Sequence, residues 1–156
     1  MPLVFDDRQL LAPGIQDATL EEIDRHFARF QKTDKRIKLF DSLRAFLGEV
    51  ARAFIGCQVI IDGSFVMPCV DEPGDIDLIL VLPADIDLSG DFKPHQYNLV
   101  SARRVKTEFK FDCRTVNAGS AAEQEWIEFF SQVDVKWCRQ FGLPADSKKG
   151  LVRVLP

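Results

Sequence analysis

Histidine is scarce in this chain, and its scarcity limits the kinds of metal site that the sequence can form. The two histidines, His26 and His95, lie far in sequence from the cysteines, and no two cysteines form a C-x-x-C pair. Structural zinc sites are built from closely spaced cysteine and histidine ligands, so we do not expect one here. Without a secretion signal, we expect reduced and buried thiols at the four cysteines, Cys57, Cys69, Cys113 and Cys138.

Long apolar runs and an excess of positive charge are also missing. No apolar run approaches the roughly 20 residues that span a bilayer, and residues 1–7 contain no basic region followed by an apolar stretch. We therefore expect a cytoplasmic protein with neither a membrane span nor a signal peptide. The formal net charge of -4 argues against a protein held on nucleic acid mainly by a broad basic surface.

The composition that is present is that of a globular domain. The 156 residues are 46% hydrophobic and 28% charged, which fits a single domain over residues 1–156 with its own core. Periodicity predicts an irregular segment over residues 1–18, helices near 20–30, 34–54, 95–106 and 120–132, strands at 58–62, 76–82 and 107–116, and a candidate short strand at 150–155. This order predicts a small mixed α/β (α+β) domain in which helices flank a mixed β-sheet.

Two short motifs carry the functional signal. Gly63-Ser64 closes one apolar strand, and Asp75-Ile76-Asp77 opens the next. Aspartates at positions i and i+2 of a strand point to the same face, where their oxygens can bind a hard cation such as Mg²⁺. A glycine beside a serine lets the backbone approach a phosphate, and Phe65 adds a further backbone amide. The motifs together predict a site for a metal–triphosphate complex.

Asp112 is the candidate for a third carboxylate. If its strand lies beside the strand that carries Asp77, three carboxylates can hold two divalent cations, which clamp the attacking and leaving oxygens of a phosphoryl displacement. Asp112 could also accept the proton of the attacking hydroxyl. Glu108 is the alternative third carboxylate, and the plainer interpretation of Asp112 is a solvent-facing side chain that pairs with Lys110 or Arg114.

The segment from Gly63 to Ile79 resembles the signature of the polymerase-β-type nucleotidyltransferase superfamily. That signature is a Gly-Ser turn, a short spacer and a D-x-D motif followed by hydrophobic residues. The resemblance covers roughly residues 35–116. The stretches at 126–130 and 149–154 are similar to those of small stand-alone bacterial members with no assigned reaction.

The resemblance implies a palm-like nucleotidyltransferase fold and a defined reaction. A nucleoside monophosphate would pass from an NTP, with ATP as the expected donor, to a hydroxyl acceptor on a protein, an RNA or a small molecule, with release of pyrophosphate. The implied cofactor is Mg²⁺ or Mn²⁺. The implied metal ligands and catalytic residues are Asp75, Asp77 and Asp112, and the implied nucleotide-binding residues are Gly63, Ser64 and Phe65.

One departure from the superfamily pattern favours other interpretations. Minimal members often read G-S-x-A-R-G after the turn, whereas this chain reads GSFVMP and lacks the arginine. Substitutes for that phosphate contact are Arg103, Arg104, Lys110 or Arg114, and we expect Lys148 and Lys149 to lie on the surface.

The alternative function is a catalytically degenerate nucleotide-binding protein or a toxin–antitoxin-like interaction protein, with a partner protein or a second copy of the chain. A metal-dependent nuclease is less favoured, because no basic groove for nucleic acid is evident in the sequence.

Overall fold

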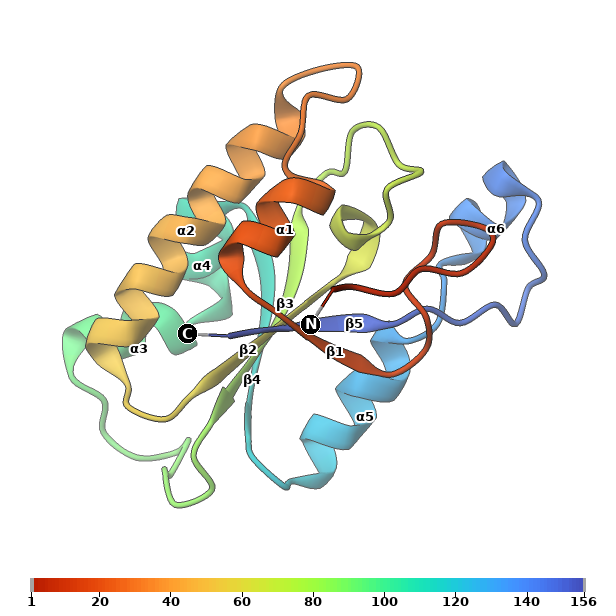
Figure 1. Cartoon of the computed structure of the whole chain (residues 1–156). Coiled ribbons are helices and arrows are strands. Elements are labelled where there is room, and N and C mark those ends of the chain that lie inside the picture. Colours follow the sequence, from red (N-terminus) through yellow and green to blue (C-terminus); the bar gives the residue numbers. More distant parts are fainter. Residues whose placement is uncertain (1, 156) are drawn as a thin grey trace.

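A five-stranded mixed sheet forms the centre of the structure, a computed structural model that describes residues 2–155 (Figure 1). Its strands, in the spatial order β1-β5-β2-β3-β4, are β1 (Ile15–Ala18), β5 (Leu151–Val154), β2 (Gln58–Asp62), β3 (Ile76–Leu82) and β4 (Phe111–Asn117). The β1–β5 and β3–β4 pairs are parallel, and β2 pairs antiparallel with both β5 and β3. The mixed α/β class expected from the sequence is confirmed, and the predicted domain ends at residues 1 and 156 lie outside the described residues.

Within the described part of the chain, six helices cover the two faces of the sheet unequally. They are α1 (Leu20–Phe27), α2 (Lys35–Ala53), α3 (Pro94–Val100), α4 (Ala102–Phe109), α5 (Ala121–Phe130) and α6 (Val135–Phe141), and a short 3₁₀ turn, η1 (Gly63–Val66), follows β2. In Figure 1, α1 to α4 lie on one side of the sheet, α5 lies on the other, and α6 lies beside one end. Within residues 2–155, no helix combines the length with the apolar composition that a bilayer crossing requires.

The two faces of β3 belong to different apolar layers. Its even-numbered residues, from Ile76 to Leu82, lie in the large core beneath α1 to α4. Ile79 and Val81 lie in a second cluster with Trp126 of α5. Since side chains alternate along a strand, Asp77 points to the same side of the sheet as Ile79, toward α5. This face is where the site described below is found.

The first helix begins where the sequence predicts it, at Leu20, but it ends at Phe27 and not near residue 30. Thr19 caps α1 with both hydrogen bonds of a capping box. The Glu22 amide donates to Thr19 Oγ1 at 3.2 Å, and the Thr19 amide donates to Glu22 Oε2 at 2.9 Å. The predicted second helix and the strands at 58–62 and 76–82 are also confirmed.

The region before β4 differs from the prediction. The helix predicted at 95–106 is two helices that meet at Ser101, whose side chain caps α4. The strand predicted at 107–116 begins only at Phe111, because α4 continues to Phe109 and ends at Lys110 in the left-handed conformation. Phe109 and Val105, four residues apart, are both buried on the core side of α4. This helical spacing outweighs the polar–apolar alternation that suggested a strand.

Two elements near the ends of the chain were not predicted. Residues 15–18 form β1 in the segment expected to be irregular, and residues 135–141 form α6. A four-residue edge strand is stabilised by its partner, and the partner of β1 is β5, 136 residues further along the chain. Such a strand carries little local signal of its own.

The four cysteines are free thiols. Cys113 and Cys138 are buried, as expected, and Cys57 and Cys69 are half-buried. Burial raises the pKa of Cys113 to about 12, so this thiol is inert as a nucleophile at neutral pH.

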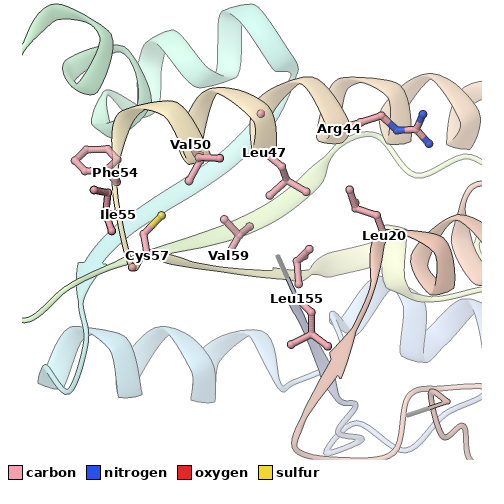
Figure 2. Close-up of a pocket in the computed structure, with 13 residues that line it drawn as sticks. Leu20, Arg44, Leu47, Val50, Phe54, Ile55, Cys57, Val59 and Leu155 are labelled. Carbon is pink, nitrogen blue, oxygen red and sulfur yellow. The ribbon is translucent and has the colours of Figure 1, made fainter.

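An apolar cavity of about 580 Å³ lies between α2 and the sheet (Figure 2). Its wall includes Leu47 of α2, Val59 of β2 and Leu155 after β5. Among the described residues of its lining, Arg44 alone is charged, and Figure 2 shows its guanidinium directed away from the other labelled side chains. Because none of the lining residues within 2–155 is acidic, this cavity does not suit a metal–triphosphate complex, and the predicted motifs lie elsewhere.

Candidate functional site

Three aspartates form a row across neighbouring strands at one end of the sheet. Asp77 of β3 lies opposite Asp62 of β2 on one side and opposite Asp112 of β4 on the other. Directly paired residues of adjacent strands project to the same face of a sheet. The predicted proximity of Asp77 and Asp112 is therefore present in the structure, and Asp62 adds a carboxylate that the sequence analysis did not consider.

The Gly-Ser turn packs directly against the middle carboxylate of this row. Gly63 has a φ of +79°, and a Cβ atom built on it would lie 2.0 Å from Asp77 Oδ2. Only glycine tolerates both this backbone conformation and this approach. Gly63 and Ser64 open onto a cavity of about 620 Å³, whose lining also includes Asp75 and Asp77. The two motifs predicted to cooperate thus share one cavity.

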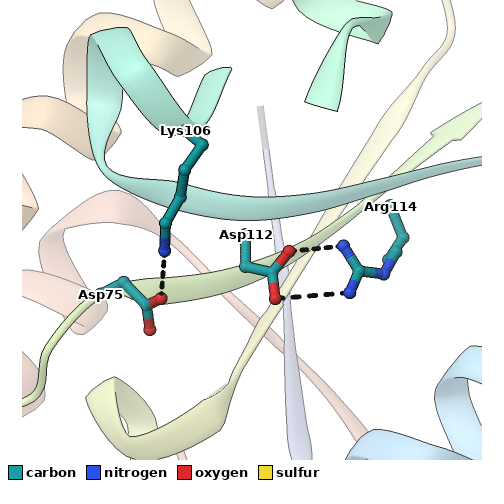
Figure 3. Close-up of polar contacts among 4 residues, drawn as sticks. All are labelled: Asp75, Lys106, Asp112 and Arg114. Carbon is teal, nitrogen blue, oxygen red and sulfur yellow. Dashed lines mark hydrogen bonds and ion pairs between the residues drawn. The ribbon is translucent and has the colours of Figure 1, made fainter. Parts of the chain in front are cut away.

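Two carboxylates beside Asp77, those of Asp75 and Asp112, are held by cations (Figure 3). Lys106 of α4 donates to Asp75 Oδ2 at 2.8 Å. Arg114 binds both oxygens of Asp112, and its guanidinium lies 4.8 Å from the ring centre of Trp126 on α5. The predicted pairing of Asp112 with Arg114 is thus present together with its placement beside Asp77.

The carboxyl group of Asp77 has a strongly raised pKa. Burial is the main cause, followed by the negative charges of Asp75 and Asp112, and together they raise the pKa of Asp77 to about 7. This carboxyl is therefore about half protonated at neutral pH. Lys149 and Lys106 oppose this rise only in part. A buried carboxyl with a raised pKa beside other carboxylates is typical of a site that binds a cation or carries out acid–base chemistry.

A buried lysine completes the electrostatics of the site. Lys149, expected on the surface, is only 2% exposed and lines the cavity. Burial lowers its pKa, and the carboxylates of Asp62 and Asp77 oppose that change. Asp62 is fully buried, neither carboxylate oxygen has a hydrogen-bond partner among the described residues, and burial raises its pKa well above the ordinary range. Buried charged side chains are uncommon, so little in the sequence marks either residue.

Arg36 of α2 fixes the spacer that joins the two motifs. It is 1% exposed, and its guanidinium donates to five carbonyl oxygens, those of Phe27, Ser64, Phe65, Met67 and Val70. Burial lowers the pKa of Arg36 to about 10. One side chain therefore holds much of the spacer, and the helical periodicity did not mark it as important.

The remaining sequence candidates are not brought to the cavity. Glu108 lies on α4 and pairs with Arg104 at 3.2 Å, so it does not replace Asp112 on the sheet. Arg103 and Lys110 are exposed. The ring of Phe65 is buried in the core, which leaves only its backbone to serve a nucleotide. Of the cations proposed to replace the missing arginine, only Arg114 reaches the carboxylate row.

The sequence matches a protein family over residues 3–155, described as a family of unknown function, DUF6932. The chain belongs to this family. No curated protein and no solved structure matches this chain. The family match spans nearly all of the described residues and assigns no reaction to them.

The donor set of the site suits a hard cation such as Mg²⁺. Asp75, Asp77 and Asp112 offer carboxylate oxygens, the ligands that Mg²⁺ prefers. The pKa of Asp77 is raised by burial and then by the negative charges of Asp75 and Asp112, and a cation would neutralise those charges. In the present side-chain conformations, residues 2–155 contain no group of three or more histidine, cysteine, aspartate or glutamate side chains close enough together to hold a metal ion. The ion pairs to Lys106 and Arg114 would have to exchange for the cation.

Gly63→Ala is expected to lower the free energy of unfolding by about 2 kcal/mol, from left-handed strain and from displacement of the Asp77 carboxylate. Gly119→Ala is the matched control, since Gly119 has a φ of +76° and a Cβ atom built on it would meet nothing within 4 Å. Urea denaturation of both variants measures the difference. Equal losses would show that Gly63 does not need to accommodate Asp77.

Proposed function

We propose that this protein is a Mg²⁺-dependent nucleotidyltransferase that transfers a nucleoside monophosphate from an NTP, with ATP as the expected donor, to a hydroxyl acceptor. The observation that carries the proposal is the contact between the Gly63 turn and Asp77, the middle carboxylate of a cross-strand row, at a cavity of about 620 Å³. This volume lies within the range of small-molecule sites. The fold is proposed to be the palm-like nucleotidyltransferase fold.

The carboxylates would hold the cation. Asp75, Asp77 and Asp112 are the proposed ligands, with Mn²⁺ as a substitute for Mg²⁺. The bound cation would neutralise charge on the phosphates and on the leaving group. Asp77, whose pKa is about 7, would become fully ionised in the presence of the cation, because an adjacent positive charge favours the charged form of a carboxyl.

The rest of the chain would bind and orient the phosphates. Gly63 and Ser64 line the cavity, and the backbone amide of Phe65 extends the same turn. Asp112 would accept the proton of the acceptor hydroxyl once Arg114 has released one of its oxygens. Positioning and charge neutralisation would supply most of the rate enhancement.

The acceptor is proposed to be a hydroxyl on a protein, an RNA or a small molecule. A partner protein or a second copy of the chain would supply further contacts to it. A cytoplasmic location would give the site access to NTP and Mg²⁺.

The experiment is nucleotidyl transfer from α-³²P-labelled NTPs in the presence of Mn²⁺ or Mg²⁺ and a cell lysate as the source of acceptor. The wild type is expected to label a component of the lysate or itself. The double variant Asp75→Asn/Asp77→Asn is expected to lower the amount of transferred label by at least about 10³-fold, because two proposed metal ligands lose their charge. Asp85→Asn, an exposed aspartate, is the control and should label normally.

The second candidate is a nucleotide-binding or toxin–antitoxin-like interaction protein without turnover. The observation that favours it is the pairing of Asp75 with Lys106 and of Asp112 with Arg114, which neutralises these two carboxylates without a metal ion. Metal-dependent binding of a non-hydrolysable NTP by equilibrium dialysis, with no label transferred, would support this candidate against the first. Cleavage of nucleic acid in the absence of NTP would instead support a nuclease.

A further inference from the structure

Lys149 is the most constrained cation of the cavity. It lines the same cavity as Gly63, Ser64 and Asp77, although only 2% of its surface is exposed. Lys136 also lines the cavity, but it is exposed and its ammonium lies 4.9 Å from the ring centre of Trp137. A buried ammonium at the wall of a cavity is costly to maintain unless it has a partner. Lys149 therefore calls for an explanation that a surface lysine would not.

The backbone around Lys149 is fixed on both sides. The Lys149 amide donates to the carbonyl of Ser131 at 2.9 Å, and the Gly150 amide donates to the carbonyl of Leu11 at 2.8 Å. A Cβ atom at Gly150 would lie 2.2 Å from the carbonyl oxygen of Ala12, so no larger residue fits there. The Lys149 side chain thus starts from a rigid position where β5 meets the N-terminal segment.

The ammonium retains unused donors. Its Nζ donates to the carbonyl of Phe130 at 3.0 Å, and no ion pair joins it to a carboxylate within residues 2–155. An ammonium has three N–H donors, so two remain for another acceptor. Burial lowers the pKa of Lys149, and the nearby carboxylates of Asp62 and Asp77 oppose that change.

We propose that Lys149 Nζ donates to the terminal phosphate oxygens of the bound triphosphate, and so supplies a positive charge that the GSFVMP segment after the turn does not provide. This inference rests on the proposed function, because it names a phosphate-binding residue of the same site. The competing interpretation is a purely structural lysine that balances the buried charge of Asp62.

A double-substitution experiment separates the two roles. The variants are Lys149→Met, Asp62→Asn and Asp62→Asn/Lys149→Met, with Lys148→Met as the control that removes the same charge from the exposed neighbouring residue. The dissociation constants of a non-hydrolysable ATP analogue with Mn²⁺ and of inorganic tripolyphosphate are measured by equilibrium dialysis, and thermal denaturation gives the stability of each variant.

For a phosphate-binding lysine, Lys149→Met raises both dissociation constants by about tenfold or more, the loss typical of a hydrogen bond to a charged group. Lys148→Met changes them by less than about twofold. The double variant regains thermal stability, because a buried carboxylate and a buried ammonium are removed together, but it does not regain phosphate binding. If Lys149→Met alone does not fold, the double variant compared with Asp62→Asn gives the same readout.

Two results would overturn the inference alone. One is an unchanged dissociation constant in Lys149→Met, and the other is full recovery of phosphate binding in the double variant, which would assign Lys149 to the balance of Asp62. Failure of the wild type to bind either probe would overturn the inference together with the proposed function, so the two failures are distinguishable.

Discussion

Replacing Arg36 by methionine is expected to lower the free energy of unfolding by about 4 kcal/mol, a large fraction of the roughly 5–15 kcal/mol that stabilises an ordinary domain. The guanidinium is buried and donates to five carbonyl oxygens of α1 and the 64–70 segment. Methionine fills a similar volume but donates nothing, so each of the five carbonyls would lose a buried hydrogen bond. The carbonyls of Ser64 and Met67 keep the amides of Met67 and Val70 as donors, and a buried carbonyl left without any donor costs about 1–3 kcal/mol before relaxation.

Urea denaturation followed by circular dichroism tests this expectation. Arg44→Met is the matched control, because it removes the same charge from the same helix at an exposed position. It should cost less than about 1 kcal/mol, since Arg44 is exposed and its guanidinium lies 5.0 Å from the ring centre of Phe40, a contact worth about 0.5–1 kcal/mol at an exposed site. Arg36→Lys should also destabilise strongly, because an ammonium has only three donors and lacks the planar fork. A loss in Arg36→Met no larger than that in Arg44→Met would show that the 64–70 segment is held by other contacts.

The effect of Arg36 should extend to the site. Ser64, whose carbonyl Arg36 binds at 3.4 Å, belongs to the turn that faces the cavity. Any Arg36 variant that remains folded is therefore expected to bind nucleotide more weakly than its stability alone would predict, since the turn would no longer be fixed relative to Asp77.

Asp77→Asn is expected to abolish nucleotidyl transfer and at the same time to stabilise the metal-free protein above pH 7. Folding raises the pKa of Asp77 from its ordinary 3.8 to about 7, so the folded state binds a proton more tightly than the unfolded state does. The stabilising contribution of that proton is complete below pH 3.8 and is lost as the pH rises to about 7. The change in pKa corresponds to up to about 4 kcal/mol, at about 1.4 kcal/mol per pH unit.

Denaturation between about pH 5 and 8 without divalent cations measures this effect. The wild type should lose stability as the pH rises through this window, and Asp77→Asn should show a shallower slope and a higher free energy of unfolding at the upper end. Asp62, whose pKa burial also raises, leaves a residual slope in the variant. Addition of Mg²⁺ should stabilise the wild type at the upper end and leave Asp77→Asn unchanged. If the free energy of unfolding depended on pH equally in the two proteins, the raised pKa of Asp77 would be contradicted.

The elements that the sequence predicts well are those with strong local causes. The start of α1, the helix α2 and the strands β2 and β3 depend on residues only a few positions apart along the chain, and the sequence predictions for them are confirmed. The short edge strand β1 and the break at Ser101 depend on distant partners or on a single capping side chain. Local periodicity could not reveal them.

The residues of the candidate site also fall into those that the local sequence predicts and those that depend on distant partners. The spacing of Asp75 and Asp77 at the start of one strand, and a glycine placed before Ser64, follow from the chain itself. The position of Asp112 beside Asp77 depended on which strands become neighbours and in which register, because a shift of one residue would turn Asp112 to the opposite face. The sequence analysis predicted a third carboxylate only if the strand of Asp112 lies beside the strand of Asp77. The parallel pairing of β3 and β4 meets this condition.

The order of residues along the chain was enough to identify Asp75, Asp77 and Asp112 as candidate carboxylates, the glycine before Ser64, and roughly which strands carry them. The burial of Arg36, Asp62 and Lys149 around that site arises only from the packing of the folded chain. Charged residues usually remain in water, so their burial depends on the fit of carbonyls and opposite charges that distant parts of the chain contribute. No window of sequence contains those partners.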